Sequence, residues 1–152
     1  MGLGKTIQTL ALILTRPRQV EKSTTKECKG TLLVVPLSLV DQWRREIIEK
    51  TTLKAYVHHG PKREVDPRRL VNYDVVITTY DTVSSECFAR GEKEPTGNGR
   101  GVFLVNWWRI VLGTVPILVI PEHILLTLCY RRSTHDQESQ GENVIGVLCS
   151  LS

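Results

Sequence analysis

The sequence predicts an α/β fold with a parallel sheet. Three short runs rich in apolar residues, 31–35, 74–78 and 108–112, are typical of strands that are buried on both faces. Residues 54–58 alternate in polarity, as a further strand would. Helix-forming segments lie between these runs, and strands that alternate with helices favour a parallel sheet. The length of 152 residues allows a single domain.

The sequence predicts three helices, one before the first strand at residues 7–14 and two between strands at residues 40–50 and 80–87. In the second of these, Trp43 shares one face with Val40 and Ile47, so we expect it in the core rather than stacked on a ligand. Ser38 is the expected N-cap of the same helix. Two segments are expected to be loops because they are polar or rich in glycine: residues 18–30 and 90–101.

The first six residues, Met-Gly-Leu-Gly-Lys-Thr, match the second half of a phosphate-binding loop and precede a predicted helix. In such a loop, backbone N–H groups point at phosphate oxygens and the helix places its positive end there. Gly2 and Gly4 would let the backbone approach the phosphates. Lys5 would reach the outer phosphates, and the Thr6 hydroxyl would bind magnesium. Two alternatives fit the same residues: a fortuitous pair of glycines, or an N-myristoylation signal of the form Met-Gly-x-x-x-Thr.

The charge of the chain is unevenly distributed. The whole sequence carries a net charge of +4, whereas residues 1–112 contain 18 basic and 12 acidic side chains, a net charge of +6. A basic segment is compatible with a polyanionic partner such as DNA. The longest apolar stretch, residues 115–130, is shorter than the ~20 residues that a membrane-spanning helix needs, so we expect no membrane association.

The sequence shows no spacing typical of a metal site. The four cysteines lie far apart, which disfavours a zinc knuckle or a redox pair. His58 and His59 are adjacent, and neighbouring residues of a strand point to opposite sides. Their two rings therefore make a poor pair of ligands for one metal ion.

Several segments follow the order of motifs in one known family. Residues 1–10 and residues 31–43, Thr-Leu-Leu-Val-Val-Pro-Leu-Ser-Leu-Val-Asp-Gln-Trp, resemble the first two motifs of the Swi/Snf-related helicase-like ATPases. Three later segments also resemble that family: residues 56–63, 74–80 and 107–112. The glycine-rich segment before Trp107 is similar to that of the DNA-repair branch that carries a ring finger. The resemblance covers residues 1–112 and implies an incomplete RecA-like P-loop parallel sheet with flanking helices.

The resemblance also implies site residues, cofactors and partners. Lys5 and Thr6 would hold the phosphates and the magnesium ion of ATP. Four residues would lie near the DNA backbone: Pro36, Ser38, Thr78 and Thr79. Each has a simpler alternative, because a proline stops a strand, a serine caps a helix and a threonine ends a strand. The family implies double-stranded DNA or chromatin as partner, a nuclear location, and a second ATPase lobe that this sequence does not contain.

The sequence departs from the family pattern after Leu112. The family continues with Asp-Glu-Ala-His, whose acids hold magnesium and polarise the attacking water, whereas this chain continues with Gly113. We therefore expect no intact catalytic residue, and we interpret residues 113–152 as an unrelated tail translated from a retained intron or after a frameshift. Two functions remain open. One is the ATP-binding N-terminal lobe of a DNA-dependent ATPase or translocase of the remodelling or repair type; the other is a catalytically dead remnant with at most weak nucleotide or DNA binding.

Overall fold

The fold is built around a sheet of four parallel strands. The computed structural model describes residues 3–16, 29–61, 63–64, 66–87, 101–105 and 107–113. The strands are β1 (Thr31–Val35), β2 (Ala55–His58), β3 (Val75–Thr79) and β4 (Arg109–Leu112). Their order in the sheet is β2-β3-β1-β4, and every pair of neighbours is parallel. The predicted parallel α/β sheet is therefore confirmed.

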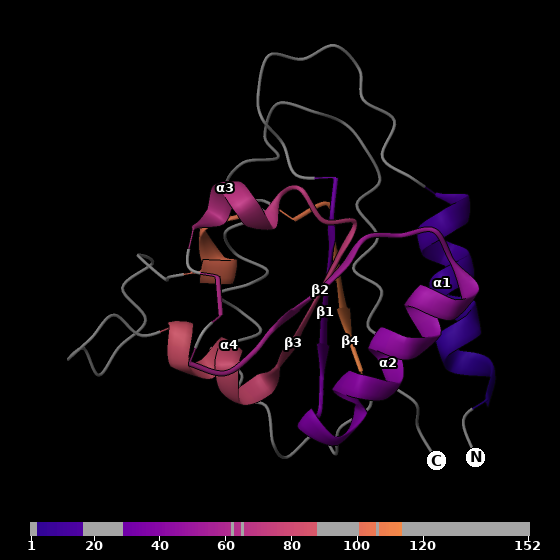
Figure 1. Cartoon of the computed structure of the whole chain (residues 1–152), viewed down its shortest axis with the longest axis horizontal. Helices are drawn as coiled ribbons and strands as arrows, with labels where there is room; N and C mark the ends of the chain where they lie inside the picture. The colour runs from indigo at the N-terminus through magenta and orange to yellow at the C-terminus, as the bar shows by residue number, and fades with distance from the viewer. Residues whose placement is uncertain are drawn as a thin grey trace, which may run out of the picture.

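Helices cover both faces of this sheet (Figure 1). They are α1 (Leu3–Thr15), α2 (Leu37–Lys50), α3 (Pro67–Leu70), α4 (Tyr80–Cys87) and a short 3-10 helix, η1 (Gly101–Leu104). Helices α1 and α2 lie on one side of the sheet, and α3, α4 and η1 lie on the other. None of the helices in the described part of the chain has the length and apolar character needed to cross a membrane.

The two faces of the sheet bury separate apolar clusters. On the α1 and α2 side, strand residues such as Leu33, Val35 and Ile77 pack against Trp43 and Ile47. Trp43 is buried, which confirms its predicted place in the core. The opposite face of β1 and β3 packs against α3, α4 and η1 through these residues: Leu32, Val34, Val76, Leu70, Val83, Val102 and Phe103. Because β1 and β3 are covered on both faces, nearly every residue in them can be apolar.

The structure differs from the sequence predictions at several element boundaries. Helix α2 begins at Leu37, and its N-cap is Pro36, which makes no side-chain capping bond, so the prediction of Ser38 as the N-cap is wrong. Pro36 fits this position because its ψ of 146° is extended and therefore lies outside the helix, while its φ of −56° suits the proline ring and its carbonyl accepts a hydrogen bond from the Leu39 N–H. Most of the predicted loops, 18–30 and 90–101, fall outside the described residues.

Two short helices were not predicted from the sequence. Helix α3 begins after Asp66, whose carboxylate accepts a hydrogen bond from the Arg68 N–H at 2.9 Å, and Pro67 occupies its first position. Asp-Pro is a typical helix start, but a single turn of four residues has too little periodicity to be recognised. The 3-10 helix η1 depends on a contact that is distant in the sequence.

That contact is made by Glu86, a buried acid on α4. Its carboxylate accepts hydrogen bonds from His58 Nε2 at 2.8 Å, from Arg63 Nε at 2.7 Å and from the Val102 N–H at 3.0 Å. Gly101 precedes Val102 with a φ of +54°, and a β-carbon there would overlap the Glu86 carboxylate. Through these hydrogen bonds, Glu86 connects α4 to the end of β2, to the turn that follows β2 and to the start of η1.

The ionised form of Glu86 is favoured in the folded chain. Burial by itself would raise the pKa of Glu86, but the hydrogen bonds from His58, the Val102 N–H and Arg63 together lower it below its ordinary value of 4.5. A carboxylate with a lowered pKa in the folded state stabilises the fold above its unfolded pKa. That stabilisation is lost as the pH falls through the folded pKa.

We predict that Glu86→Gln destabilises the fold and flattens its acid dependence. At pH 7 the free energy of unfolding, measured by urea titration, should fall by about 2–4 kcal/mol, because buried donors lose a charged acceptor. Between pH 5 and pH 3 the wild-type stability should decline more steeply than that of the variant.

Glu46→Gln on α2 is the matched control for this prediction. Glu46 forms an exposed i, i+4 pair with Lys50, with Nζ and Oε2 3.1 Å apart, and its pKa is lowered chiefly by the hydrogen bond from Gln42. Exposed pairs of this kind contribute about 0.5 kcal/mol or less. Equal losses of stability in the two variants would contradict the assignment of Glu86 as the buried junction.

Candidate nucleotide and nucleic-acid site

The parallel strands end at nearly the same level, and their carboxyl ends define one edge of the sheet. Val35 is paired with Thr79, Val34 with Leu112, and His58 with Thr78. The residues that follow the strands, namely Pro36, His59, Tyr80 and Gly113, therefore lie along this edge. We call it the carboxyl edge. In open α/β sheets ligands bind at this edge.

Helix α1 begins at the carboxyl edge (Figure 1). At the other end of α1, Arg109 Nη2 donates a hydrogen bond to the Arg16 carbonyl at 3.0 Å, which ties the end of the helix to the start of β4. The N-terminal turn of α1 is thereby held at the edge where the strands end. Unpaired backbone N–H groups and the positive helix end favour an anion in this place.

Gly4 and Thr6 lie in the first turn of α1. A β-carbon at Gly4 would meet only Gln8 Nε2, at 3.6 Å, which is an ordinary contact. The Thr6 side chain is half-buried, and its hydroxyl has no hydrogen-bond partner among the residues that the structure describes. A half-buried hydroxyl in the first turn of α1 fits the predicted role of Thr6 as a ligand of magnesium. Gly2 lies outside the described residues, and only the backbone of Lys5 is described.

Pro36 and Ser38 lie where α2 begins, at the carboxyl edge. Pro36 is half-buried, whereas Ser38 and the neighbouring Leu37 are exposed. Ser38 is therefore accessible to a partner in the first turn of α2.

Thr78 and Thr79 are placed differently from Ser38. Thr78 is fully buried, and its hydroxyl donates a hydrogen bond to the His58 carbonyl at 2.9 Å. Thr79 Oγ1, also buried, accepts a hydrogen bond from the Thr82 N–H at 3.2 Å and lies 2.9 Å from Thr82 Oγ1. The structure thus brings all four predicted DNA-contacting residues to one edge, but it gives the two threonine hydroxyls partners within the protein.

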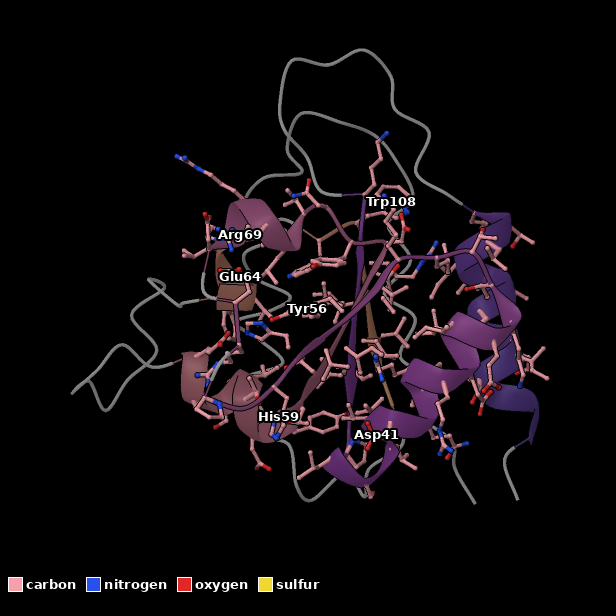
Figure 2. All side chains as sticks on the ribbon, viewed as in Figure 1. Asp41, Tyr56, His59, Glu64, Arg69 and Trp108 are labelled. Atoms are coloured by element: carbon pink, nitrogen blue, oxygen red, sulfur yellow. The ribbon has the colours of Figure 1, made fainter. Side chains whose placement is uncertain are left out.

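His59 extends the group of polar residues at this edge. Its side chain is exposed, and Nδ1 lies 3.1 Å from Thr82 Oγ1 and 3.4 Å from Thr79 Oγ1. In Figure 2, His59 lies at the end of the molecule where α4 begins, the end at which Asp41 of α2 also lies. From the sequence, His59 was predicted only to make a poor metal ligand pair with His58, and Thr82 was not among the predicted site residues. The alternation of side chains along β2 could have indicated that His58 is buried and that His59 is exposed at this edge.

The end of β4 lacks an acidic side chain at the expected position. The Gly113 N–H donates a hydrogen bond to the Val34 carbonyl at 2.7 Å, and the Tyr80 hydroxyl donates to the Gly113 carbonyl at 2.7 Å. Across the part of the chain that the structure describes, no group of three His, Cys, Asp or Glu side chains is placed to hold a metal ion. Among the described residues, Thr6 is the side chain predicted to bind magnesium, together with the phosphates that the ion accompanies.

The chain is similar to large DNA-repair and helicase proteins. It is 42% identical over 91 residues to an uncharacterized ATP-dependent helicase of Schizosaccharomyces pombe, and 37% identical over 98 residues to the DNA repair protein RAD5A of Arabidopsis thaliana. These alignments cover 57% and 62% of this chain but 8% and 9% of the relatives. The chain therefore spans about a tenth of the length of these relatives.

A solved structure and a family of domains also match. The Sulfolobus solfataricus SWI2/SNF2 ATPase core in complex with dsDNA aligns with a TM-score of 0.45 and 25% identity, over 74% of this chain and 19% of that one. The SNF2-related domain matches residues 1–113, which include the first turn of α1 and all four strands. Because this family model matches residues 1–113, about three quarters of the sequence, the chain belongs to the SNF2-related domain family.

Proposed function

We propose that this chain is the nucleotide-binding N-terminal lobe of a DNA-dependent ATPase or translocase of the chromatin-remodelling or DNA-repair type. The observation that carries the proposal is the position of Gly4, Lys5 and Thr6 in the first turn of α1, at the carboxyl edge, within a SNF2-related domain. ATP with magnesium is the proposed ligand of that turn. Duplex DNA in the nucleus is the proposed partner of the same edge.

The glycine at position 4 supports a ligand in contact with the backbone. Its φ is not positive, and an added β-carbon would find room beside Gln8. Neither strain nor packing therefore requires glycine, although glycine is less favourable than alanine in a helix by up to ~1 kcal/mol. Close approach of phosphate oxygens to the backbone gives a reason for it.

We predict that Gly4→Ala separates stability from nucleotide binding. The substitution should raise the free energy of unfolding by about 0.4–1 kcal/mol, because alanine reduces the entropy of the unfolded chain at a position where it fits. Binding of a fluorescent ATP analogue with magnesium, measured by titration, should weaken by about tenfold or more, because the methyl group occupies space that a phosphate needs.

Ala11→Gly, in the middle of the same helix, is the control for Gly4→Ala. Ala11 is exposed and lies away from the first turn of α1. This variant should be less stable and should bind the analogue as the wild type does. Unchanged binding by Gly4→Ala would reject the first turn of α1 as the phosphate site.

A second function, binding of nucleotide without hydrolysis, is favoured by the end of β4. Phosphoryl transfer needs acidic groups that hold the metal ion and orient the attacking water. Gly113 stands where the family places the first of these acids, and a β-carbon there would lie 2.7 Å from Val35 Cγ1 and 3.3 Å from the Val34 carbonyl oxygen. The surroundings of Gly113 are thus packed around a residue without a side chain.

We predict that the chain releases no phosphate from ATP above the rate of a Lys5→Ala variant, with or without duplex DNA. A coupled assay for inorganic phosphate measures both rates. DNA-stimulated turnover that Lys5→Ala abolishes would instead support the active ATPase lobe. Nucleotide binding without turnover would support the second function.

We also predict that Gly113→Ala destabilises the fold through Val35. The loss should be about 1–3 kcal/mol in urea unfolding, because the methyl group overpacks a buried site. In a Val35→Ala background the additional loss should be much smaller, since the contacted methyl group is gone. Losses that add without coupling would show that Val35 does not restrict position 113.

A further inference from the structure

The two histidines at the end of β2 have opposite surroundings. His58 is fully buried and hydrogen-bonded to Glu86, whereas the side chain of His59 is exposed at the carboxyl edge. Only Nδ1 of His59 has protein partners among the described residues, Thr82 and Thr79. The second ring nitrogen, Nε2, has none there.

The hydrogen-bonding needs of the neighbouring hydroxyls favour one position for the ring proton of His59. Thr79 Oγ1 already accepts the Thr82 N–H, so the Thr79 hydroxyl needs an acceptor, which Thr82 Oγ1 provides at 2.9 Å. The Thr82 hydroxyl can then donate to His59 Nδ1 at 3.1 Å. This direction leaves each hydroxyl with both a donor and an acceptor role. It makes Nδ1 an acceptor and places the ring proton of neutral His59 on Nε2.

We propose that His59 Nε2–H binds a backbone phosphate of duplex DNA, with Thr79 and Thr82 as positioning residues. This inference rests on the proposed function, because it takes duplex DNA as the partner of the carboxyl edge. It also gives Thr79 a role that its buried hydroxyl can perform. Thr79 orients His59 through Thr82 instead of contacting the DNA itself.

The chemistry of His59 suits a phosphate. In both its neutral and its protonated form the ring donates through Nε2, and the protonated form adds a positive charge. Ser38 is also exposed at this edge, in the first turn of α2, and hydroxyls and helix N-termini are common donors to phosphate oxygens. Asp81, exposed in the first turn of α4, is the opposing charge closest in sequence to Thr82. Removing that charge should strengthen binding of an anion.

The test is fluorescence anisotropy of a labelled 20-base-pair duplex titrated with the full chain. His59→Ala should weaken binding by about 10- to 150-fold, as loss of one hydrogen bond to a charged group does. His59→Gln, whose Nε2 can donate from a similar position, should retain most of the affinity. Asp81→Asn should increase the affinity. Thermal unfolding of each variant establishes that it is folded at the assay temperature.

Lys54→Ala is the matched control. Lys54 is exposed and immediately precedes β2, so it lies at the opposite edge of the sheet. Its removal deletes a full positive charge but should change the affinity by less than about twofold, because exposed charges more than a Debye length apart are screened. A loss with Lys54→Ala equal to that with His59→Ala would show a diffuse charge effect and overturn the proposal.

The positioning role has a spectroscopic readout. Two-bond ¹H–¹⁵N correlation spectra of the imidazole rings should show the Nε2–H tautomer for neutral His59. Thr82→Val should reduce this preference and weaken DNA binding, and Thr82→Ser should restore both. An unchanged tautomer and affinity in Thr82→Val would reject the positioning role.

The outcomes separate this inference from the function on which it rests. If the wild-type chain binds the duplex and His59→Ala binds it equally well, the role of His59 is overturned and the proposed DNA partner stands. If the wild-type chain does not bind the duplex, both are overturned.

Discussion

The candidate site depends on the parallel pairing of the strands, which brings their carboxyl ends to nearly the same level. Because β1, β3 and β4 run in the same direction and end together, the residues after each strand meet at one edge, although they are separated by dozens of positions in the sequence. The tie between Arg109 and the end of α1 adds the first turn of that helix to the same edge. A polar surface therefore forms where backbone donors and helix ends converge.

At the end of β2, two adjacent histidines have different roles: His58 is buried in the core and His59 is exposed. His58 points inward to Glu86, which also holds the following turn and η1, while His59 points outward and is oriented by hydroxyls of β3 and α4. The buried carboxylate fixes the backbone on one side of His59, and the threonines fix its ring on the other. In the proposed interaction, His59 therefore presents its donor in a fixed orientation, which reduces the entropy lost when a ligand binds.

Glycine occurs at positions 4 and 113 for different physical reasons. Gly4 has room for a β-carbon, so its surroundings within the protein do not require glycine. Gly113 has no such room, because Val35 and the carbonyl of Val34 approach it closely. The proposed phosphate ligand gives a reason for the first, and packing at the end of β4 gives a reason for the second. Gly4 bears on nucleotide binding and Gly113 bears on hydrolysis, so the two activities are tested separately.

The sequence by itself determined the fold class, the strands to within one residue and the core position of Trp43, because apolar runs and helical spacing are local properties. It also determined the family, through the order of its motifs. The tertiary structure decided what local patterns cannot contain: that Glu86 is a buried junction, that η1 forms against it, that Pro36 rather than Ser38 precedes α2, and that the hydroxyls of Thr78 and Thr79 face inward. Each of these depends on partners brought together by the sheet from distant parts of the chain, and no spacing rule within one segment encodes them.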